Sequence, residues 1–302
     1  MTNKSVAIIL LNWNNSDYTV ECIKSLFDIT YLNKKIIVVD NASTDKSIDN
    51  LKQYLPKINL ITNEKNLGFT GGNNVGIKMA LNEKFDFIML LNNDTIVDKA
   101  FLEPLLSSFE FDTAAVQPLI LNYHNKETIW NCGGHINKTF GIFSTYGKNK
   151  SIKSFKNKEE KFTEWISGCC FMIRSSAVNE VGLLDDEFFV YFEDVDWSLR
   201  LRSKDYKLKI IPQSIIYHHE GVSWKNKNRS FEGTISPYTH YLNIRNHILI
   251  LKKHLKLFNP IGVFLYQLVK ISSYLIYFLI RFRFNKFKMV LRGFVHAMKF
   301  KK

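Results

Sequence analysis

Four short apolar runs constrain the fold of the N-terminal part of the chain most strongly. They are VAIILL (6–11), KIIVVD (35–40), INLIT (58–62) and FDFIMLL (85–91). Between them lie segments with helical patterns, DYTVECIKSLF, STDKSIDNLKQYL and GGNNVGIKMALNEK. Strands that are apolar on both faces and alternate with helices are typical of a parallel sheet covered on both sides. The sequence therefore predicts an α/β fold.

Polar residues follow each of these predicted strands. The segments are NWNN, DNAS, NLGFTGGNN and NNDT. In open α/β sheets, ligands bind beyond the carboxyl ends of the strands. We therefore expect a ligand site where these four segments meet.

The glycines of NLGFTGGNNVG do not match either common phosphate-binding motif. They do not form GxGxxG, they follow the third strand rather than the first, and no GK[ST] is present. Two interpretations stay open, a close approach of the backbone to a diphosphate and a simple turn.

Asp40 and Trp13 follow the second and the first predicted strands. A carboxylate at Asp40 can accept hydrogen bonds from a nucleobase or a ribose, and Trp13 can stack on the base. The alternative for Asp40 is an Asx turn into the next helix, for which Ser43 or Thr44 is the expected cap.

The segment DDEFFVYFEDVDWSLRLR (185–202) mixes acids with aromatic residues, unlike a solvated acidic face. A helix that begins near Asp194 places this carboxylate in its first turn, where the helix dipole favours the ionised form. Asp194 can then take a proton from a hydroxyl within hydrogen-bond reach. The alternative is that Glu193 or Asp194 only caps the helix.

A single acid, Asp94, stands in LLNNDT, and His218 and His219 end a later predicted strand. Neighbouring side chains of a strand point to opposite faces, so we expect at most one His in the site. Asp94, one His, diphosphate oxygens and water would suffice for Mg²⁺ or Mn²⁺. A structural His is the alternative.

The C-terminal part differs in charge from the rest. Residues 1–232 hold 28 of the 41 Lys and Arg residues and all 28 acids, whereas residues 233–302 hold 13 basic residues and no acid. We predict a domain at 1–236 and a basic, amphipathic helical tail at 237–302. One apolar stretch of the tail approaches membrane-span length but is interrupted by Gln267 and Lys270.

Helices of this kind suit the surface of an anionic membrane. A true span, and a buried or dimer-forming tail that makes a homo-oligomer, are the alternatives. The tail is too apolar for a phosphate-binding arm, so no nucleic acid is expected as a partner. The four cysteines lack metal-ligand spacing and are expected to be buried and reduced. The N-terminus is read as a first strand rather than a signal peptide.

Taken in order, six segments resemble the inverting family 2 glycosyltransferases, whose nucleotide-sugar-binding fold is called GT-A. Within that family the rhamnosyltransferase-like enzymes of bacterial surface polysaccharide synthesis look most similar. The segments span about residues 5–223 and are VAIILLNWNN, IIVVDNASTDKS, NLGFTGGNNVGIKMA, FIMLLNNDT, WISGCCFMIRSSAVNEVGLLDDEFFVYFEDVDWSLRLR and HHEGVS.

This resemblance implies a role for each motif. Asp194 matches the catalytic base, and Asp94 matches the acid that binds a divalent cation, Mg²⁺ or Mn²⁺, with His218 as second ligand and His219 as the fallback. Asn92 replaces the first acid of the DxD motif and would ligate weakly or shape the turn. Acceptor-binding candidates are Trp165, Glu193 and Trp197. The candidates for binding the nucleotide and diphosphate of the donor are Asn12, Trp13, Asp40, Asn66, Gly68, Gly71, Gly72, Asn73 and Asn93.

The resemblance also implies the reaction and its place. A sugar would pass from a nucleotide-diphosphate sugar, with dTDP-rhamnose as first choice, to a hydroxyl of a lipid-linked or growing surface glycan. The enzyme would be cytoplasmic, peripheral on the inner face of the membrane. Two alternatives are a catalytically inactive scaffold that binds nucleotide sugar at the membrane, and a nucleotidyltransferase of similar sheet. The second needs a Gly/Lys/Arg-rich loop where NWNNSDY stands.

Overall fold

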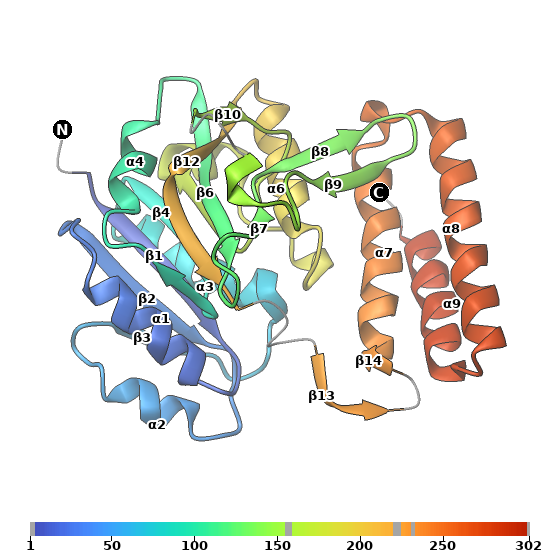
Figure 1. The fold of residues 1–302 in the computed structure, drawn as a ribbon, viewed down its shortest axis with the longest axis horizontal. Helices are drawn as coiled ribbons and strands as arrows, with labels where there is room; N and C mark the ends of the chain where they lie inside the picture. Colours follow the sequence, from blue (N-terminus) through green and yellow to red (C-terminus); the bar gives the residue numbers. More distant parts are fainter. Residues whose placement is uncertain (1–3, 155–158, 220–224, 231–232, 301–302) are drawn as a thin grey trace. The chain divides into compact units, whose positions relative to one another are not determined.

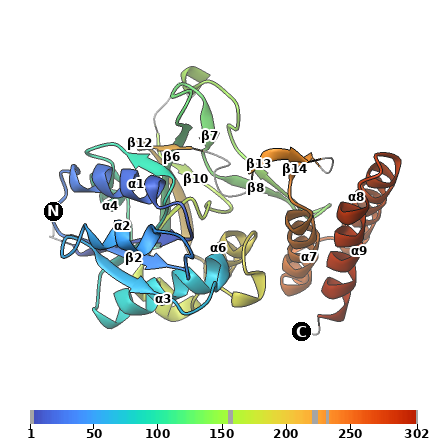
Figure 2. The same ribbon diagram turned by 90° about the horizontal axis from the view of Figure 1, so that it is seen from below.

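The computed structural model describes residues 4–154, 159–219, 225–230 and 233–300, and Figure 1 and Figure 2 show them in two views. The chain forms two compact units. The first contains Met1–His135, Thr145–Phe189 and Glu193–Glu220, and the second contains Ile136–Ser144, Val190–Phe192 and Gly221–Lys302. The second unit thus holds the predicted tail and two internal segments that the sequence pattern did not assign to it.

A mostly parallel sheet forms the centre of the first unit. Its order is β10-β12-β6-β11-β4-β1-β2-β3, with β5 beside β12 and β7 beside β6. Strand β11 is antiparallel to both of its neighbours. The bounds are β1 Val6–Asn12, β2 Lys34–Asp40, β3 Asn59–Thr62, β4 Phe87–Asn92, β5 Thr95–Val97, β6 Thr113–Asn122, β7 Ile129–Asn131, β10 Lys161–Phe162, β11 Cys170–Arg174 and β12 Lys207–His218.

Helices bury both faces of this sheet. Alternate residues of β1 show why, because Ile8 packs in a cluster with Cys22 and Ile23, whereas Ile9 packs in another cluster with Ile77. This period of two is expected for a strand. The bounds are α1 Asp17–Phe27, α2 Ser47–Lys52, α3 Gly68–Asn82, α4 Leu102–Ser107, α5 Ser175–Val181 and α6 Glu193–Arg202.

The predicted α/β pattern of strands and helices is confirmed for β1 to β4, α1, α3 and α6. Two details differ. Helix α2 begins only at Ser47, because the Ser43 hydroxyl donates a hydrogen bond to Asp40 instead of capping a helix. The strand predicted to end at His218 and His219 is β12, which ends at His218, and its pairing with β6 shifts register between Ile211 and Ile215.

The second unit contains most of one hairpin and three helices. The hairpin is β8 Gly134–Asn137 and β9 Ile142–Thr145, and a further pair is β13 Lys225–Ser230 and β14 Gly233–Ile235. Helices α7 (Pro237–Lys253), α8 (Pro260–Ile280) and α9 (Phe284–Lys299) share a small apolar core. Serine and asparagine caps, Ser236 and Asn259, precede the prolines that open α7 and α8, which is a favoured start for a helix.

Candidate active site

The carboxyl ends of the central strands lie at one edge of the sheet, as the sequence predicted. In the parallel ladders Asn12 pairs with Asp40, Asp40 with Thr62, and Leu11 with Asn92. The polar segments after these strands are therefore neighbours. All four cysteines are free and buried, which confirms that expectation.

A chain of hydrogen bonds joins three of these strand ends. Asn93 Nδ2 donates to Thr19 Oγ1 at 2.7 Å, and Thr19 Oγ1 donates to Asn12 Oδ1 at 2.6 Å. Asn12 Nδ2 then donates to Asp40 Oδ2 at 2.8 Å. Thr19 was missed by the sequence analysis, because a threonine in an amphipathic helix carries no signal of such a role. The chain fixes the edge of the sheet before any ligand binds.

Asp40 is completely buried and forms a turn with Ser43. Its Oδ1 accepts the Ser43 N–H at 2.9 Å and its Oδ2 accepts the Ser43 hydroxyl at 2.6 Å. These contacts match the Asx-turn interpretation, and contact with a nucleobase stays a prediction. Trp13, by contrast, is 56% exposed, so its ring is available for stacking.

The glycine-rich segment forms the start of α3. Gly68 has φ +72°, and Asn66 Oδ1 accepts its N–H at 2.8 Å, so Asn66 and Gly68 shape the turn into the helix. Asn66 also accepts a hydrogen bond from Asn41, a buried residue that the sequence analysis did not single out. Asn73 Nδ2 donates to Phe69 O at 2.8 Å within the helix.

Gly71 and Gly72 lie inside α3 rather than in a loop. A Cβ at Gly72 would clash with Leu11, and one at Gly76 would lie 2.7 Å from Ile9. The small size of Gly72 therefore lets α3 lie against β1, and contact of Gly72 with a diphosphate stays a prediction. A Cβ at Gly71 would meet Leu67 at 2.8 Å, so Gly71 is also confined by its own turn.

Asp94 and His218 meet in a buried position. Pairing of β5 with β12 sets His218 opposite Thr95, and this brings His218 Nε2 to 3.1 Å from Asp94 Oδ1. Both residues are buried, and Trp130 packs against the imidazole at 4.4 Å between ring centroids. Asp94 Oδ1 and His218 Nδ1 form no hydrogen bond within the described part of the chain.

His219 and Asn92 are placed differently from this pair. His219 Nε2 lies 3.3 Å from Glu21 Oε2, and its ring stacks on Tyr123, so the two histidines diverge as expected of a strand. The Asn92 carbonyl accepts the Thr95 hydroxyl at 2.7 Å, so Asn92 shapes the turn through its backbone. Metal ligation by the Asn92 side chain stays a prediction.

Asp194 lies in the first turn of α6, as predicted. Its Oδ2 accepts the Gly168 N–H at 2.8 Å and its Oδ1 accepts the Val195 N–H at 2.8 Å. Burial raises the pKa of Asp194 above the ordinary value of an aspartate, although these two N–H groups oppose the shift. A raised pKa makes this carboxylate a stronger base than the unperturbed aspartate that the sequence suggested.

Glu193 is more buried than Asp194. Only 5% of it is exposed, and its Oε2 has no hydrogen-bond partner among the residues that the structure describes. Burial, followed by the charge of Asp194, raises the pKa of Glu193 well above its ordinary value. The structure thus presents two neighbouring carboxyl groups of different exposure, and Glu193 stays an acceptor-binding candidate.

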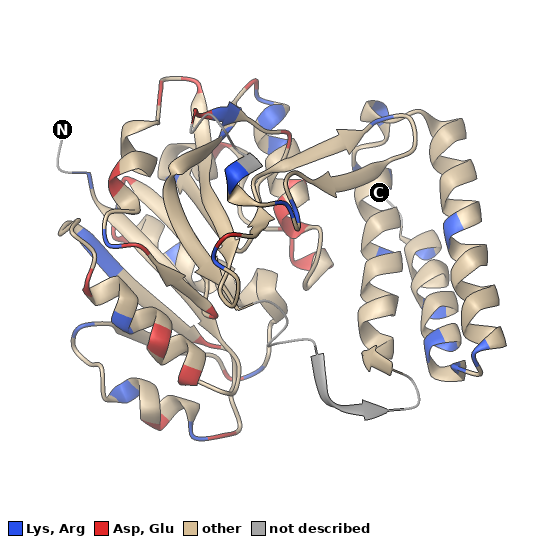
Figure 3. Cartoon of the chain, in the orientation of Figure 1, with Lys and Arg blue, Asp and Glu red and all other residues tan. Residues whose placement is uncertain are grey.

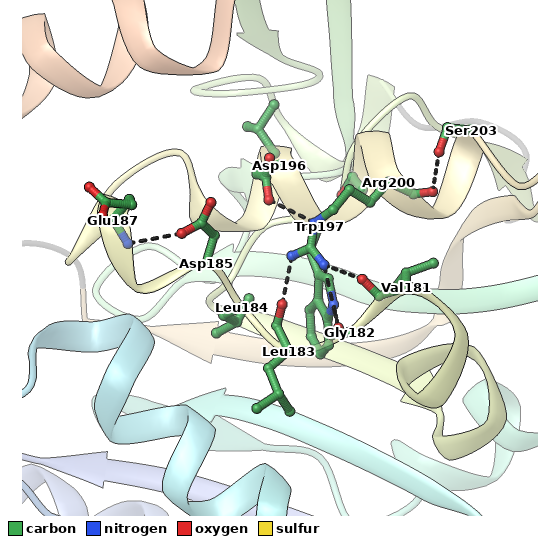
Figure 4. A network of polar contacts seen from close by, with 12 residues as sticks. Val181, Gly182, Leu183, Leu184, Asp185, Glu187, Asp196, Trp197, Arg200 and Ser203 are labelled. Atoms are coloured by element: carbon green, nitrogen blue, oxygen red, sulfur yellow. Dashed lines mark hydrogen bonds and ion pairs between the residues drawn. The ribbon is translucent and has the colours of Figure 1, made fainter. Parts of the chain in front are cut away.

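A network of polar contacts fixes α6 against the segment before it (Figure 4). Asp196 accepts from Arg200 Nε at 2.8 Å, and Arg200 donates to the carbonyls of Val181 at 2.5 Å and Leu183 at 2.7 Å. Charged hydrogen bonds of this kind are among the stronger ones in proteins. The network is absent from the sequence-based candidates, because only the fold brings residues 181–183 to α6.

The two predicted acceptor tryptophans lie in different surroundings. Trp197 is completely buried against Phe171, and its Nε1 donates to Gly182 O at 2.9 Å. Trp197 therefore belongs to the core, which corrects its assignment to the acceptor pocket. Trp165 is 8% exposed and lies tightly against Gly134, and its Nε1 has no hydrogen-bond partner in the described residues. Trp165 stays a candidate.

The chain is similar to known glycosyltransferases in sequence. The family described as Glycosyl transferase family 2 matches residues 5–182, more than half of the chain. A low-salt glycan biosynthesis hexosyltransferase, Agl10, of Haloferax volcanii is 26% identical over 253 residues, 81% of this chain and 74% of that protein. The N-acetylglucosaminyl-diphospho-decaprenol L-rhamnosyltransferase of Mycobacterium tuberculosis is 26% identical over 208 residues, 62% of this chain and 67% of that protein.

A third relative is longer than this chain. The poly-beta-1,6-N-acetyl-D-glucosamine synthase of Staphylococcus aureus is 26% identical over 242 residues, 76% of this chain. The match covers 54% of the synthase, so the chain spans about half the length of that protein.

Solved structures share the fold of this chain. GalNAc-T7 with UDP, GalNAc and Mn²⁺ aligns with a TM-score of 0.63 at 16% identity, covering 82% of this chain and 48% of that one. The mannosyltransferase PcManGT of Pyrobaculum calidifontis, with GDP-Man and Mn²⁺, aligns with a TM-score of 0.57 at 10% identity, covering 98% and 76%. These likenesses confirm the predicted GT-A fold. With the family match, they show that this chain is a glycosyltransferase and belongs to glycosyl transferase family 2.

Proposed function

We propose that this chain transfers a sugar, with inversion, from a nucleotide-diphosphate sugar to a hydroxyl of a surface glycan. The meeting of Asp94 and His218 carries this proposal. They lie far apart in sequence, come within 3.1 Å and expose polar atoms to each other rather than to water. Burial of this carboxylate and imidazole is costly, because His218 Nδ1 has no hydrogen-bond partner among the described residues, and a bound ligand would offset this cost.

The ligand that fits this pair is a divalent cation. Neighbouring ligands of an octahedral ion with bonds of about 2.1 Å lie about 3 Å apart, close to the separation of Asp94 Oδ1 and His218 Nε2. The described residues contain no group of three or more His, Cys, Asp or Glu side chains that could hold a metal. Two protein ligands leave room for diphosphate oxygens, and the structural neighbours with Mn²⁺ support this proposal. Bound Mg²⁺ or Mn²⁺ would stabilise the charge that develops on the departing diphosphate.

Asp194 is the proposed base. Its carboxylate removes the proton of the acceptor hydroxyl, and the hydroxyl oxygen forms a bond to the anomeric carbon from the face opposite the nucleotide. The bond between this carbon and the diphosphate oxygen breaks, and the diphosphate leaves with the electron pair. One displacement inverts the anomeric centre. Burial raises the pKa of Glu193, and in its protonated form this carboxyl would donate a hydrogen bond to the acceptor.

The proposed substrates follow the named relatives. One of these is a hexosyltransferase of glycan biosynthesis, and another is an N-acetylglucosaminyl-diphospho-decaprenol L-rhamnosyltransferase. We take dTDP-rhamnose as the first donor to test, ahead of UDP-galactose, UDP-glucose and UDP-N-acetylhexosamines. The acceptor is a lipid-linked or growing glycan.

The three C-terminal helices support a place at the membrane surface. One helix, α8, is long and apolar enough to span a membrane, and only 6% of its most apolar window is buried. Its two interrupting polar residues, Gln267 and Lys270, contact His247 of α7. Figure 3 shows Lys and Arg but no acidic residue on α7 to α9. The exposed large apolar residues of α8 and α9 include Phe264, Val269, Ile276, Ile280, Phe294 and Met298.

A thermal-shift screen followed by turnover tests the enzymatic proposal. The purified chain is melted with each of the nucleotide sugars named above, with and without Mn²⁺. We expect a rise in the melting temperature that needs both the donor and the cation. Turnover of the selected donor, followed by NMR of the new linkage, must give the inverted anomer. A retained anomer, or binding without turnover on any lipid-linked glycan acceptor, contradicts the proposal.

Flotation with vesicles tests the membrane proposal on the full chain. We expect binding to vesicles that contain anionic lipid and weaker binding to neutral ones. Phe264→Glu, on the exposed face of α8, should release the protein. Phe111→Glu, at a fully exposed site of the first unit, is the control and should bind like the unmodified chain. Equal binding of both variants contradicts the assignment of α8 to the membrane surface.

A further inference from the structure

The residues just before Glu193 have an unusual backbone. Phe189, Tyr191 and Phe192 have φ values of 62°, 73° and 73°. Bulky residues rarely adopt positive φ, and such residues persist where surrounding contacts hold them. The segment 190–192 belongs to the second unit, and the chain then passes directly to Glu193 and Asp194 of the first.

Asn246 of α7 holds two carbonyl groups of this segment. Its Nδ2 donates to Val190 O at 2.8 Å and to Tyr191 O at 2.9 Å, and the residue is completely buried. Its Oδ1 accepts from Arg245 Nε at 2.8 Å. Because a guanidinium only donates, Arg245 fixes the amide with its nitrogen toward the two carbonyls.

The next residue of α7, His247, holds the ring of Phe192. The two rings are stacked, with centroids 5.3 Å apart and planes 8° apart. His247 Nε2 lies 2.7 Å from Gly141 O, and Lys270 Nζ lies 2.6 Å from Nδ1. A carbonyl only accepts and an ammonium only donates, so the imidazole is neutral with its proton on Nε2. Burial, together with Lys270, lowers the pKa of His247 to about 3, in agreement with this state.

Asn246 and His247 share this segment with Phe143, whose ring meets that of Phe192 edge-on at 5.6 Å between centroids, whereas other contacts hold α6 itself. Arg200 fixes the helix to residues 181–183, and the Gly168 and Val195 N–H groups hold the Asp194 carboxylate. Neither set touches the three residues that lead into Glu193. A base must lie within hydrogen-bond reach of the hydroxyl that it deprotonates. A small shift of residues 190–192 is therefore enough to weaken proton removal by Asp194.

We propose that Asn246 and His247 are positioning residues for the base Asp194. They hold residues 190–192 in a strained conformation, and this segment is joined through the backbone directly to Glu193 and Asp194. The inference rests on the proposed function, because it takes Asp194 as the base. It makes the C-terminal helices a functional part of the enzyme as well as a surface for the membrane.

Hydrogen exchange tests the structural half of the inference without any substrate. Asn246→Ala removes both donors, whereas the control Asn243→Ala, on the same helix, removes a hydrogen bond from Nδ2 to Thr239 O within α7. We expect the amides of residues 190–196 to exchange at least tenfold faster in Asn246→Ala and at an unchanged rate in Asn243→Ala. Equal exchange in both variants overturns the inference.

Kinetics test the catalytic half. With dTDP-rhamnose, or the nucleotide sugar that the thermal-shift screen selects instead, Asn246→Ala should lower kcat at least tenfold and leave the KM for the donor within a factor of two. In an Asp194→Asn background the same substitution should have little further effect, because the group that it positions is already lost. Additive losses, or an equal loss in Asn243→Ala, overturn the inference.

Two controls separate the possible failures. If Asp194→Asn alone keeps full activity, the base assignment fails, whatever Asn246 does. If Asp194→Asn is inactive and Asn246→Ala matches Asn243→Ala, only the positioning inference fails. Should Asn246→Ala not fold by circular dichroism, Phe192→Ala replaces it, since this variant removes the ring that stacks on His247 and leaves α7 unchanged. Phe192→Ala must then lower kcat in the same way, and unchanged kcat overturns the inference.

Discussion

Two parts of the candidate site differ in how their buried polar atoms are paired. On the donor side, Asn12, Asp40 and Asn66 are hydrogen-bonded to neighbouring protein groups. On the catalytic side, His218 Nδ1 and Glu193 Oε2 are buried without hydrogen-bond partners among the described residues, and Asp94 Oδ1 has only its contact with His218 Nε2 at 3.1 Å. The first part has the character of a scaffold that is complete before binding. We expect the buried polar atoms of the second part to gain partners only when a cation or a substrate binds.

This difference predicts two kinds of mutational effect. Substitutions on the donor side should lower the free energy of unfolding, because they leave buried partners unsatisfied. Substitutions on the catalytic side should lower activity and leave stability unchanged or raise it, as is common where a site stores unfavourable contacts.

The largest effect is expected for Asp194→Asn. The amide keeps the shape of the carboxylate but is not a base, and loss of a general base lowers kcat about 10²–10⁴-fold. We expect the melting temperature to stay within about 2 °C of the unmodified chain. Because burial raises the pKa of Asp194, activity of the unmodified chain should fall with decreasing pH at a higher pH than for an ordinary aspartate. Full activity of the variant removes Asp194 as the base.

Asp94→Ala should have the next largest effect. We expect the Mn²⁺ concentration for half-maximal activity to rise at least as much as the roughly 10–100-fold that follows loss of an outer-shell partner. Because Asn92 brings no charge, the unmodified chain should bind free Mn²⁺ weakly and bind it more tightly when UDP or dTDP is present. Isothermal titration of the unmodified chain with Mn²⁺, with and without nucleotide, measures both affinities. Tight binding of Mn²⁺ without nucleotide contradicts the expected weak binding of the free cation.

The sequence predicted the fold and the edge of the sheet where the site lies, but not the long-range contacts within the site. Continuous apolar runs predicted the parallel sheet, and the polar segments after them predicted the edge where the site lies. Asp94 and His218 were paired through a family resemblance, and strand pairing in the structure brings them together. Such pairing is a long-range property that no local pattern encodes.

The corrected assignment of Trp197 and the unforeseen packing role of Gly72 have a common physical origin. The sequence shows that a glycine or a tryptophan is present, but packing decides what its surroundings are. Gly72 makes space for Leu11, and Trp197 fills the core beside Phe171. Thr19 and Asn246 were missed for the same reason, since their partners lie on other elements of the chain.

Asp40→Ala should lower stability more than activity. Its removal leaves the Asn12 amide and the Ser43 hydroxyl without their buried acceptor, at a cost of about 2 kcal/mol. The control is Asp49→Ala in α2, whose side chain is 80% exposed and whose loss should change stability by less than about 0.5 kcal/mol. Urea unfolding measures both. A large loss of donor affinity at unchanged stability would instead favour direct contact of Asp40 with the nucleotide.

The smallest effect is expected for Glu193→Gln, and it has the opposite sign. The folded state binds the Glu193 proton more tightly than the unfolded state, because burial raises the pKa of this carboxyl. The stability that this proton provides is present at low pH and is lost as the pH rises through the raised pKa. A glutamine has no such loss, so the melting temperature of the variant should exceed that of the unmodified chain by about 2–4 °C at pH 8, which corresponds to roughly 1 kcal/mol.

The size of this difference depends on pH, which makes the test independent of general effects of the substitution. The gap in melting temperature should shrink as the pH falls toward 5, because Glu193 is then protonated in the folded chain. Glu187→Gln, at an exposed position of the preceding turn, should show no gap at either pH. A gap that is the same at pH 5 and pH 8 would mean that burial does not raise the pKa of Glu193. Glu193 would then no longer distinguish the catalytic side from the donor side.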